Sequence, residues 1–143
     1  MHMVEKLERL MVYIEDAKGF LKEADEVFSK GVKENNPILI RDAADKAWNA
    51  VVQATNALIL HFLAKVPSSH FERRRLLSVL EDKVSEAEKL GFRDRYGARE
   101  RNLHELVFYE GIIDLDEVRR ELEKAKTYVE DAESVTKQTH VSI

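Results

Sequence analysis

The stretch PILIRDAADKAWNAVVQATNALILHFLAK, residues 37–65, decides the fold. Its apolar residues recur with helical spacing and cover more than one face of the helix that they predict. They are Ile40, Ala43, Ala44, Ala47, Trp48, Val51, Val52, Ala54, Leu58, Ile59, Phe62 and Leu63. A helix that is apolar over so much of its girth belongs at the centre of a helical protein, and its alanines let neighbours pack closely around Trp48.

The chain before this stretch predicts another long helix, whose apolar stripe repeats at intervals of four and three residues. The stripe is Met3, Leu7, Leu10, Ile14, Ala17, Leu21, Ala24 and Phe28. Gly31 is the predicted stop, and Asn35-Asn36-Pro37 predicts a turn in which proline enters the central helix. The two long helices are expected to form an antiparallel hairpin. Met1-His2-Met3 is interpreted as a cloning scar, so His2 carries no weight.

Three shorter helices are expected after residue 65. Ser69-His70-Phe71-Glu72 has the spacing of a capping box and predicts the start of the third helix. The fourth, from about Arg93 to Glu110, is the least regular. Asp114 is the predicted cap of the fifth. Glycines end the third and fourth helices, at Gly91 and Gly111.

The composition suits one compact domain over residues 1–143, with a frayed tail over 138–143. Hydrophobic residues make up 44% of the chain and charged residues 35%, which is unlike a disordered protein. No stretch alternates like a strand. The expected fold is therefore all-α, an up-down bundle of four to five helices.

Several classes of protein are excluded by what the sequence lacks. The absence of cysteine excludes disulfides, thiol nucleophiles and thiolate metal sites. No apolar run approaches the roughly 18–20 residues of a membrane span and no signal peptide opens the chain, so a cytoplasmic protein without a membrane partner is expected. Glu-x-x-His pairs, a His-Glu-x-x-His motif and a glycine-rich phosphate loop are all absent, so neither a metal nor a cofactor is expected.

The segment RERNLHELVFYEG, residues 99–111, carries the candidate catalytic residues. On an unbroken helix Arg99 and His104 lie roughly 140° apart. Glu100 lies one turn before His104 on the same side, close enough to orient its imidazole. Charges on an apolar stripe suit a polar cleft or a subunit interface. A kinked or partly exposed helix with solvated charges is the more ordinary explanation.

The net charge of −4 argues against global steering toward nucleic acid, but the charge is uneven. Locally basic stretches supply the candidate nucleic-acid contacts Arg73, Arg74, Arg75, Arg93, Arg95 and Arg101. Such clusters are more often a solvated face. His70 is interpreted as a residue of the helix start, and Trp48 as core.

Two stretches resemble the archaeal PaREP family and, more distantly, HEPN domains. One is Ala44–Ala54 on the central helix and the other is Leu103–Gly111; the order of helices and Ser69-His70 agree as well. The resemblance covers about residues 7–135 and implies a bundle of four or five helices that usually dimerises. Many HEPN domains are metal-independent ribonucleases whose motif is an arginine and a histidine with four to six residues between them.

Only Arg99 and His104 meet that spacing here, which leaves two classes of function open. One is a non-catalytic binding module, a homodimer that docks RNA, a nucleotide or a small protein partner. The alternative is a toxin-like, metal-independent endoribonuclease. In that enzyme His104 takes the ribose 2′-OH proton and Arg99 holds the phosphate. The lack of a clean motif slightly favours the binding module.

Overall fold

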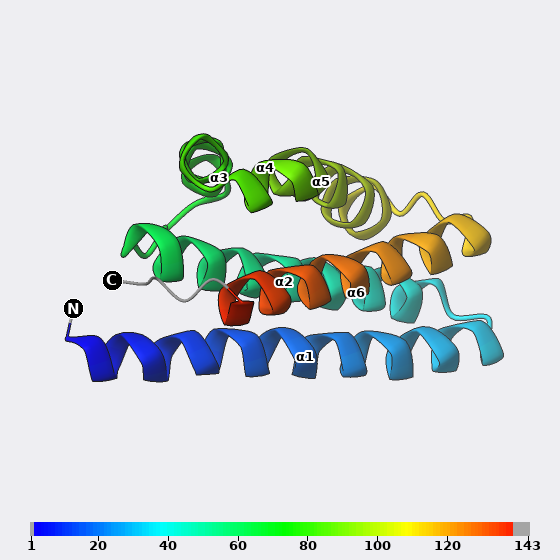
Figure 1. The fold of residues 1–143 in the computed structure, drawn as a ribbon. Helices are drawn as coiled ribbons and strands as arrows, with labels where there is room; N and C mark the ends of the chain where they lie inside the picture. The colour runs from blue at the N-terminus through cyan, green and yellow to red at the C-terminus, as the bar shows by residue number, and fades with distance from the viewer. Residues whose placement is uncertain (1, 139–143) are drawn as a thin grey trace.

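The computed structural model describes residues 2–138 and, within them, consists of helices without a strand. The all-α prediction is confirmed. The helices are α1 (Met3–Lys33), α2 (Pro37–Leu63), α3 (His70–Lys83), α4 (Ser85–Leu90), α5 (Phe92–Arg99), the π-helix η1 (Glu100–Tyr109) and α6 (Leu115–Gln138) (Figure 1). Most of the predicted frayed tail lies outside the described residues, although Gln138 still belongs to α6.

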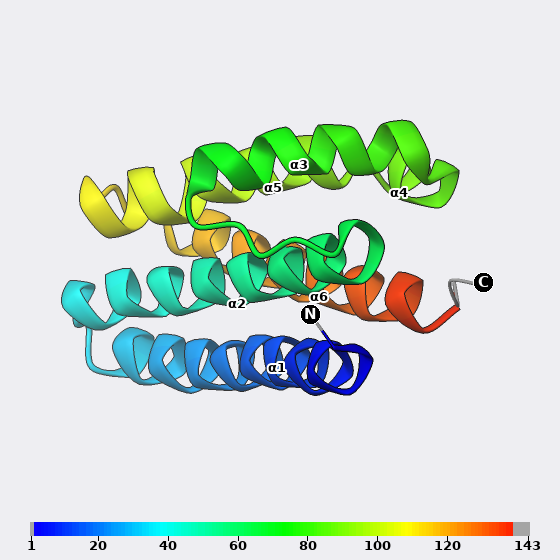
Figure 2. The same ribbon diagram turned by 90° about the vertical axis from the view of Figure 1, so that its left-hand side faces the viewer.

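The helices form layers around α2. The antiparallel hairpin of α1 and α2 is confirmed, and α6 packs against both of its helices. The shorter helices α3, α4 and α5, with η1, lie on the side of α2 away from α1 (Figure 2). No helix within residues 2–138 combines the length and the apolar character that crossing a membrane requires. The layer of short helices meets α2 along the face that carries Trp48.

The hairpin depends on a close approach at its turn. Gly31 was predicted to stop the first helix, but α1 continues to Lys33 and Gly31 is buried. A Cβ at this position would lie 2.8 Å from Cδ1 of Ile40, so the missing side chain brings α1 and α2 together. The turn itself uses Asn35, with φ of 51°, and Asn36, whose Oδ1 accepts a hydrogen bond of 3.0 Å from the Ile38 amide.

The apolar stripe of α1 is only partly core. From Ile14 to Phe28 it packs into the bundle, as predicted. Met3 and Leu7 are instead 74% and 52% exposed, so the first turns of α1 add little to the core. Helical spacing identifies a face of a helix but does not say how far along that face a neighbour extends.

Two predicted helices are each divided in the structure. Val84 has extended backbone angles, φ −124° and ψ 105°, and separates α3 from α4. The predicted fourth helix, expected to be irregular, is α5 followed by η1. The predicted helix stops at Gly91 (φ 65°) and Gly111 (φ 68°) are confirmed. The predicted cap at the start of the last helix is also confirmed, because Asp114 Oδ1 accepts a 3.2 Å hydrogen bond from the Glu117 amide.

Half of the predicted capping box forms at the start of α3. Ser69 Oγ accepts a 3.0 Å hydrogen bond from the Glu72 amide, which caps the helix. The Glu72 carboxylate accepts a hydrogen bond from Ser68 Oγ at 3.2 Å. This start places His70 at the first position of α3.

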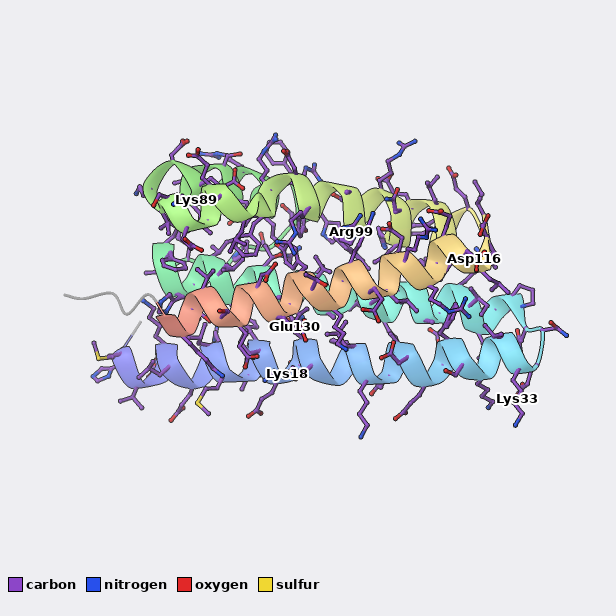
Figure 3. All side chains as sticks on the ribbon, turned by 45° about the vertical axis from the view of Figure 1, so that its right-hand side comes forward. Lys18, Lys33, Lys89, Arg99, Asp116 and Glu130 are labelled. Carbon is purple, nitrogen blue, oxygen red and sulfur yellow. The ribbon has the colours of Figure 1, made fainter. Side chains whose placement is uncertain are left out.

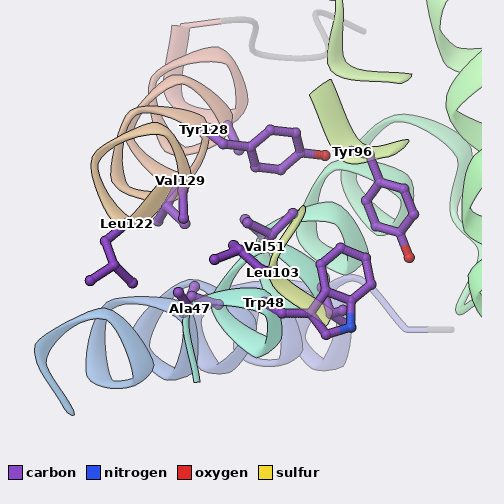
Figure 4. Packing of buried hydrophobic residues seen from close by; sticks show 14 of the residues in the cluster. Ala47, Trp48, Val51, Tyr96, Leu103, Leu122, Tyr128 and Val129 are labelled. Carbon is purple, nitrogen blue, oxygen red and sulfur yellow. The ribbon is translucent and has the colours of Figure 1, made fainter. Parts of the chain in front are cut away.

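The core surrounds three large aromatic side chains, Trp48, Tyr96 and Tyr128, each at most 1% exposed (Figure 4). Thr55 Oγ1 donates a 2.8 Å hydrogen bond to the Val51 carbonyl. The Tyr128 hydroxyl lies 2.6 Å from the same Oγ1 and therefore donates to it. Burial raises the pKa of the Tyr128 phenol above its ordinary range, so the hydroxyl stays protonated. Trp48 is core, as predicted.

Candidate functional site

The candidate site is two histidines that meet over Trp48. His70 at the start of α3 and His104 in η1 have ring centroids 5.6 Å apart, in an edge-to-face arrangement. The Trp48 ring lies 5.2 Å from the His70 ring and 5.7 Å from the His104 ring. Both imidazoles are partly exposed. We call Trp48, His70 and His104, with their partners Asp45 and Arg73, the two-histidine site.

His70 is held from the side of its Nδ1 atom. Arg73 NH1 lies 3.0 Å from this nitrogen and the Tyr96 hydroxyl lies 3.3 Å from it. Arg73 is buried and donates through Nε to Asn56 Oδ1 at 2.8 Å, so its guanidinium is fixed in place. A guanidinium has donors only, and Nδ1 of His70 is therefore the acceptor.

The surroundings of His70 also disfavour its charged form. Burial lowers its pKa most, and the nearby Arg73, His104 and Arg74 lower it further. The Glu100 carboxylate acts in the opposite direction, without reversing the shift. The His70 imidazole is consequently neutral at pH 7. Burial raises the pKa of Tyr96 to about 12, which keeps its hydroxyl protonated.

His104 is held by a carboxylate and by aromatic rings. Its Nδ1 lies 3.4 Å from Asp45 Oδ1 on α2. The imidazole lies nearly parallel to the Phe108 ring, at 6.1 Å and 12°, and the Tyr109 ring meets its edge at 4.8 Å. Asp45 was not predicted as a site residue, although it lies within the stretch 44–54 that carries the family resemblance.

The π-helix η1 determines where His104 points. π-helical turns are rare and frequently occur at functional sites. Arg41 on α2 fixes the end of η1, because its Nε and NH2 donate to the carbonyls of Phe108 at 2.8 Å and Tyr109 at 3.0 Å. Gly111 passes beside this guanidinium, and a Cβ there would lie 3.2 Å from NH1. The angle of 140° expected between Arg99 and His104 therefore does not apply, because residues 100–109 are not α-helical.

Arg99 and His104, the two candidate catalytic residues, have different partners in the structure, Glu121 and Asp45. Arg99 is buried and directed to α6, where its Nε and NH2 lie 2.8 Å and 3.4 Å from the two carboxylate oxygens of Glu121 (Figure 3). The side chains of Arg99 and Glu121 are 7% and 8% exposed. Sequence reasoning missed Glu121, which stands next to the buried Leu122 on α6.

Glu100 was predicted to orient the His104 imidazole, but its carboxylate pairs with Arg74 instead. Arg74 NH1 lies 2.6 Å from Glu100 Oε1. Asp45 contacts His104 in its place. His70, interpreted from the sequence as a helix-start residue only, occupies that position and also belongs to the two-histidine site. The predicted Ser-His pair at the helix start was the available signal.

The predicted nucleic-acid arginines differ in burial and in partners. Arg73 belongs to the two-histidine site, and Arg74, the next residue, pairs with Glu100. Arg95 pairs with Asp131 at 2.8 Å and lies over the Phe92 and Tyr128 rings. The remaining three, Arg75, Arg93 and Arg101, are exposed. Within residues 2–138, no three or more His, Asp or Glu side chains are grouped so that they could hold a metal ion.

Comparisons with known proteins place the chain in a family. No curated protein matches it significantly. A family model described as the archaeal PaREP1/PaREP8 family matches residues 12–129, which include all of α2 to η1 and most of α6. The matched region contains every residue of the two-histidine site. The chain therefore belongs to the archaeal PaREP1/PaREP8 family.

Proposed function

We propose that this chain is a cytoplasmic helical binding module that works as a homodimer and takes RNA or a nucleotide at the two-histidine site. The observation that carries the proposal is the pair of partly exposed imidazoles, 5.6 Å apart, each fixed by a charged partner. Side chains held in this way are preorganised for a ligand, because little entropy remains to be lost on binding.

Aromatic and basic side chains beside the pair support a nucleic-acid ligand. Tyr109 is 66% exposed and contacts the His104 ring, while Phe71, next to His70 in the chain, is 67% exposed. Exposed aromatic rings bind unpaired bases by stacking, and nearby arginines attract the phosphates. Arg74 pairs with Glu100, which neutralises part of its charge, and Arg101 is exposed. A small protein partner is the other ligand that such a surface accommodates.

Binding is favoured over cleavage because of what holds Arg99. Its guanidinium faces both oxygens of the Glu121 carboxylate. A phosphate would have to displace that carboxylate to be held by Arg99 in the same bidentate way. The arginine that the ribonuclease interpretation requires is thus already engaged.

A metal-independent endoribonuclease, toxin-like and neutralised by a small protein partner, remains the second candidate. The observation that favours it is the second imidazole, since His70 and His104 together could move a proton to and from a ribose 2′-hydroxyl. In this case Arg73 or Arg74, and not Arg99, would stand nearest to the phosphate.

Exposed apolar side chains on α1 support the homodimer. Met3, Val4, Leu7 and Met11 are each at least half exposed and occupy its first three turns. They lead into a groove between α1 and α6 that is lined by Leu10 and Thr136. Apolar patches of this kind mark protein contacts. We expect a dimer mass by light scattering for the wild type and a monomer mass for L7E/M11E, with unchanged circular dichroism.

The first experiment measures binding and cleavage together. Fluorescein-labelled single-stranded RNA is mixed with the wild type and His104→Ala in EDTA, followed by fluorescence anisotropy and then by a denaturing gel. We expect the wild type to bind intact RNA and His104→Ala to bind at least tenfold more weakly. His2→Ala is the matched control, because it removes an exposed histidine remote from the site. RNA cut by the wild type but not by His104→Ala would establish the second candidate, and absence of binding would refute both.

A further inference from the structure

The partners of the two histidines fix opposite proton positions on the two rings. At His70, Nδ1 accepts from Arg73 NH1 at 3.0 Å, so the proton of the neutral ring lies on Nε2. The Tyr96 hydroxyl, 3.3 Å from the same nitrogen, is a second donor that agrees with this assignment. His70 therefore presents an N–H group at the side of its ring away from Arg73.

At His104 the arrangement is reversed. Nδ1 faces a carboxylate oxygen of Asp45 at 3.4 Å, and an ionised carboxylate only accepts. The proton of the neutral His104 ring therefore lies on Nδ1, which leaves Nε2 with a free lone pair. One ring of the pair offers a donor and its neighbour offers an acceptor.

We propose that the two Nε2 atoms together bind one hydroxyl group of the ligand, and that this group is a ribose hydroxyl of RNA. A hydroxyl accepts one hydrogen bond and donates another at the same oxygen. It accepts from Nε2–H of His70 and donates to Nε2 of His104, which no purely accepting phosphate oxygen does. The inference rests on the proposed function and adds the ligand group that the site recognises.

The 2′-hydroxyl is the ribose group that separates RNA from DNA. With deoxyribose, both Nε2 atoms lose their partner in the complex, and unpaired polar groups weaken binding. We expect the wild type to bind an RNA oligonucleotide about tenfold more tightly than the DNA oligonucleotide of the same sequence. The DNA carries uracil in place of thymine, so that the two oligonucleotides differ only in the 2′-hydroxyl.

Asp45 and Arg73 act as positioning residues, so a variant of either should change the proton position as well as the selectivity. In Asp45→Ala the His104 ring loses the carboxylate that holds its Nδ1 proton. Asp42→Ala is the matched control, since it removes an aspartate one turn earlier on α2 that is also partly exposed. We expect Asp45→Ala to lose most of the preference for RNA, and Asp42→Ala to keep it.

The test joins two measurements on the full chain. Nitrogen-15 NMR of the imidazoles in the free protein at pH 7.5 reports the proton positions, and anisotropy reports affinity for RNA and for DNA. Nε2–H on His70 and Nδ1–H on His104, together with tenfold preference for RNA, support the inference. If both rings carry their proton on the same nitrogen, or if the two oligonucleotides bind with equal affinity, the ribose inference is overturned while the proposed function stands. If neither oligonucleotide binds, the proposed function fails, and the ribose assignment fails with it.

Discussion

Two polar clusters lie where the short helices meet the rest of the bundle, and they differ in how much of their hydrogen-bonding capacity is used. Arg99 and Glu121 are buried, and two nitrogens of the guanidinium face the two carboxylate oxygens. At the two-histidine site, His70 and His104 each have one ring nitrogen held and remain partly exposed. Burial of charge alone therefore does not identify a ligand site; unused hydrogen-bonding groups that reach the surface are the better criterion.

The largest effect is expected at the buried ion pair. Arg99→Met leaves the buried Glu121 carboxylate with only the exposed Lys124, whose Nζ lies 3.9 Å away, and we expect a loss of about 3–5 kcal/mol in the free energy of unfolding. The double variant R99M/E121L removes both charges and should recover most of that loss. Urea unfolding at pH 7.5 measures each value. If the double variant is as unstable as Arg99→Met, the pair is more than a structural contact.

An intermediate effect is expected at Arg41, which supports the two-histidine site without belonging to it. Arg41→Ala removes two hydrogen bonds to the last carbonyls of η1 and should lower the free energy of unfolding by about 2 kcal/mol.

Hydrogen exchange locates this loss. Amides of residues 104–110 should exchange faster in Arg41→Ala, whereas those of α6 around Glu121 should keep their protection. Arg120→Ala is the control, because it removes an exposed arginine from α6. Equal acceleration in η1 and α6 would mean that the two clusters are not independent.

The smallest effect is a pH dependence at His70. Its pKa is lowered in the folded protein, chiefly by burial, relative to the ordinary value of 6.5. The unfolded chain then binds more protons below that value, so the stability contributed by neutral His70 is full above pH 6.5 and is lost as the pH falls through the folded pKa.

Urea unfolding between pH 7.5 and pH 5 tests this sign. We expect the wild type to lose more stability than His70→Asn over the interval, while His2→Ala follows the wild type. A steeper loss in His70→Asn would show that the folded state favours the charged ring.

The elements that the sequence predicted well are those whose signal is local. The stripe of α1, the apolar girth of α2, the Ser69 cap and the ends at Gly91 and Gly111 each follow from residues a few positions apart. These signals sufficed for the hairpin and for the order of the helices. Gly31 was misinterpreted because a close approach to Ile40 depends on another helix.

The candidate site could be predicted only in part, because its contacts join distant segments. Asp45 and His104 are 59 residues apart, and His70 meets them from a third helix. The π-helix that turns His104 toward Asp45 has no counterpart in the apolar spacing of residues 99–110, which is compatible with an α-helix. Arg99 ends α5 and pairs with Glu121 on α6, a contact across 22 positions that the spacing around His104 does not indicate.

Trp48 has a practical consequence for every experiment on this protein. It is the one tryptophan of the chain, and its ring lies beside both imidazoles. Indole emission is quenched by a neighbouring imidazolium ion and changes when a base stacks nearby. The intrinsic fluorescence of the unlabelled protein therefore reports on the site, since it changes when the histidines are protonated and when a ligand binds.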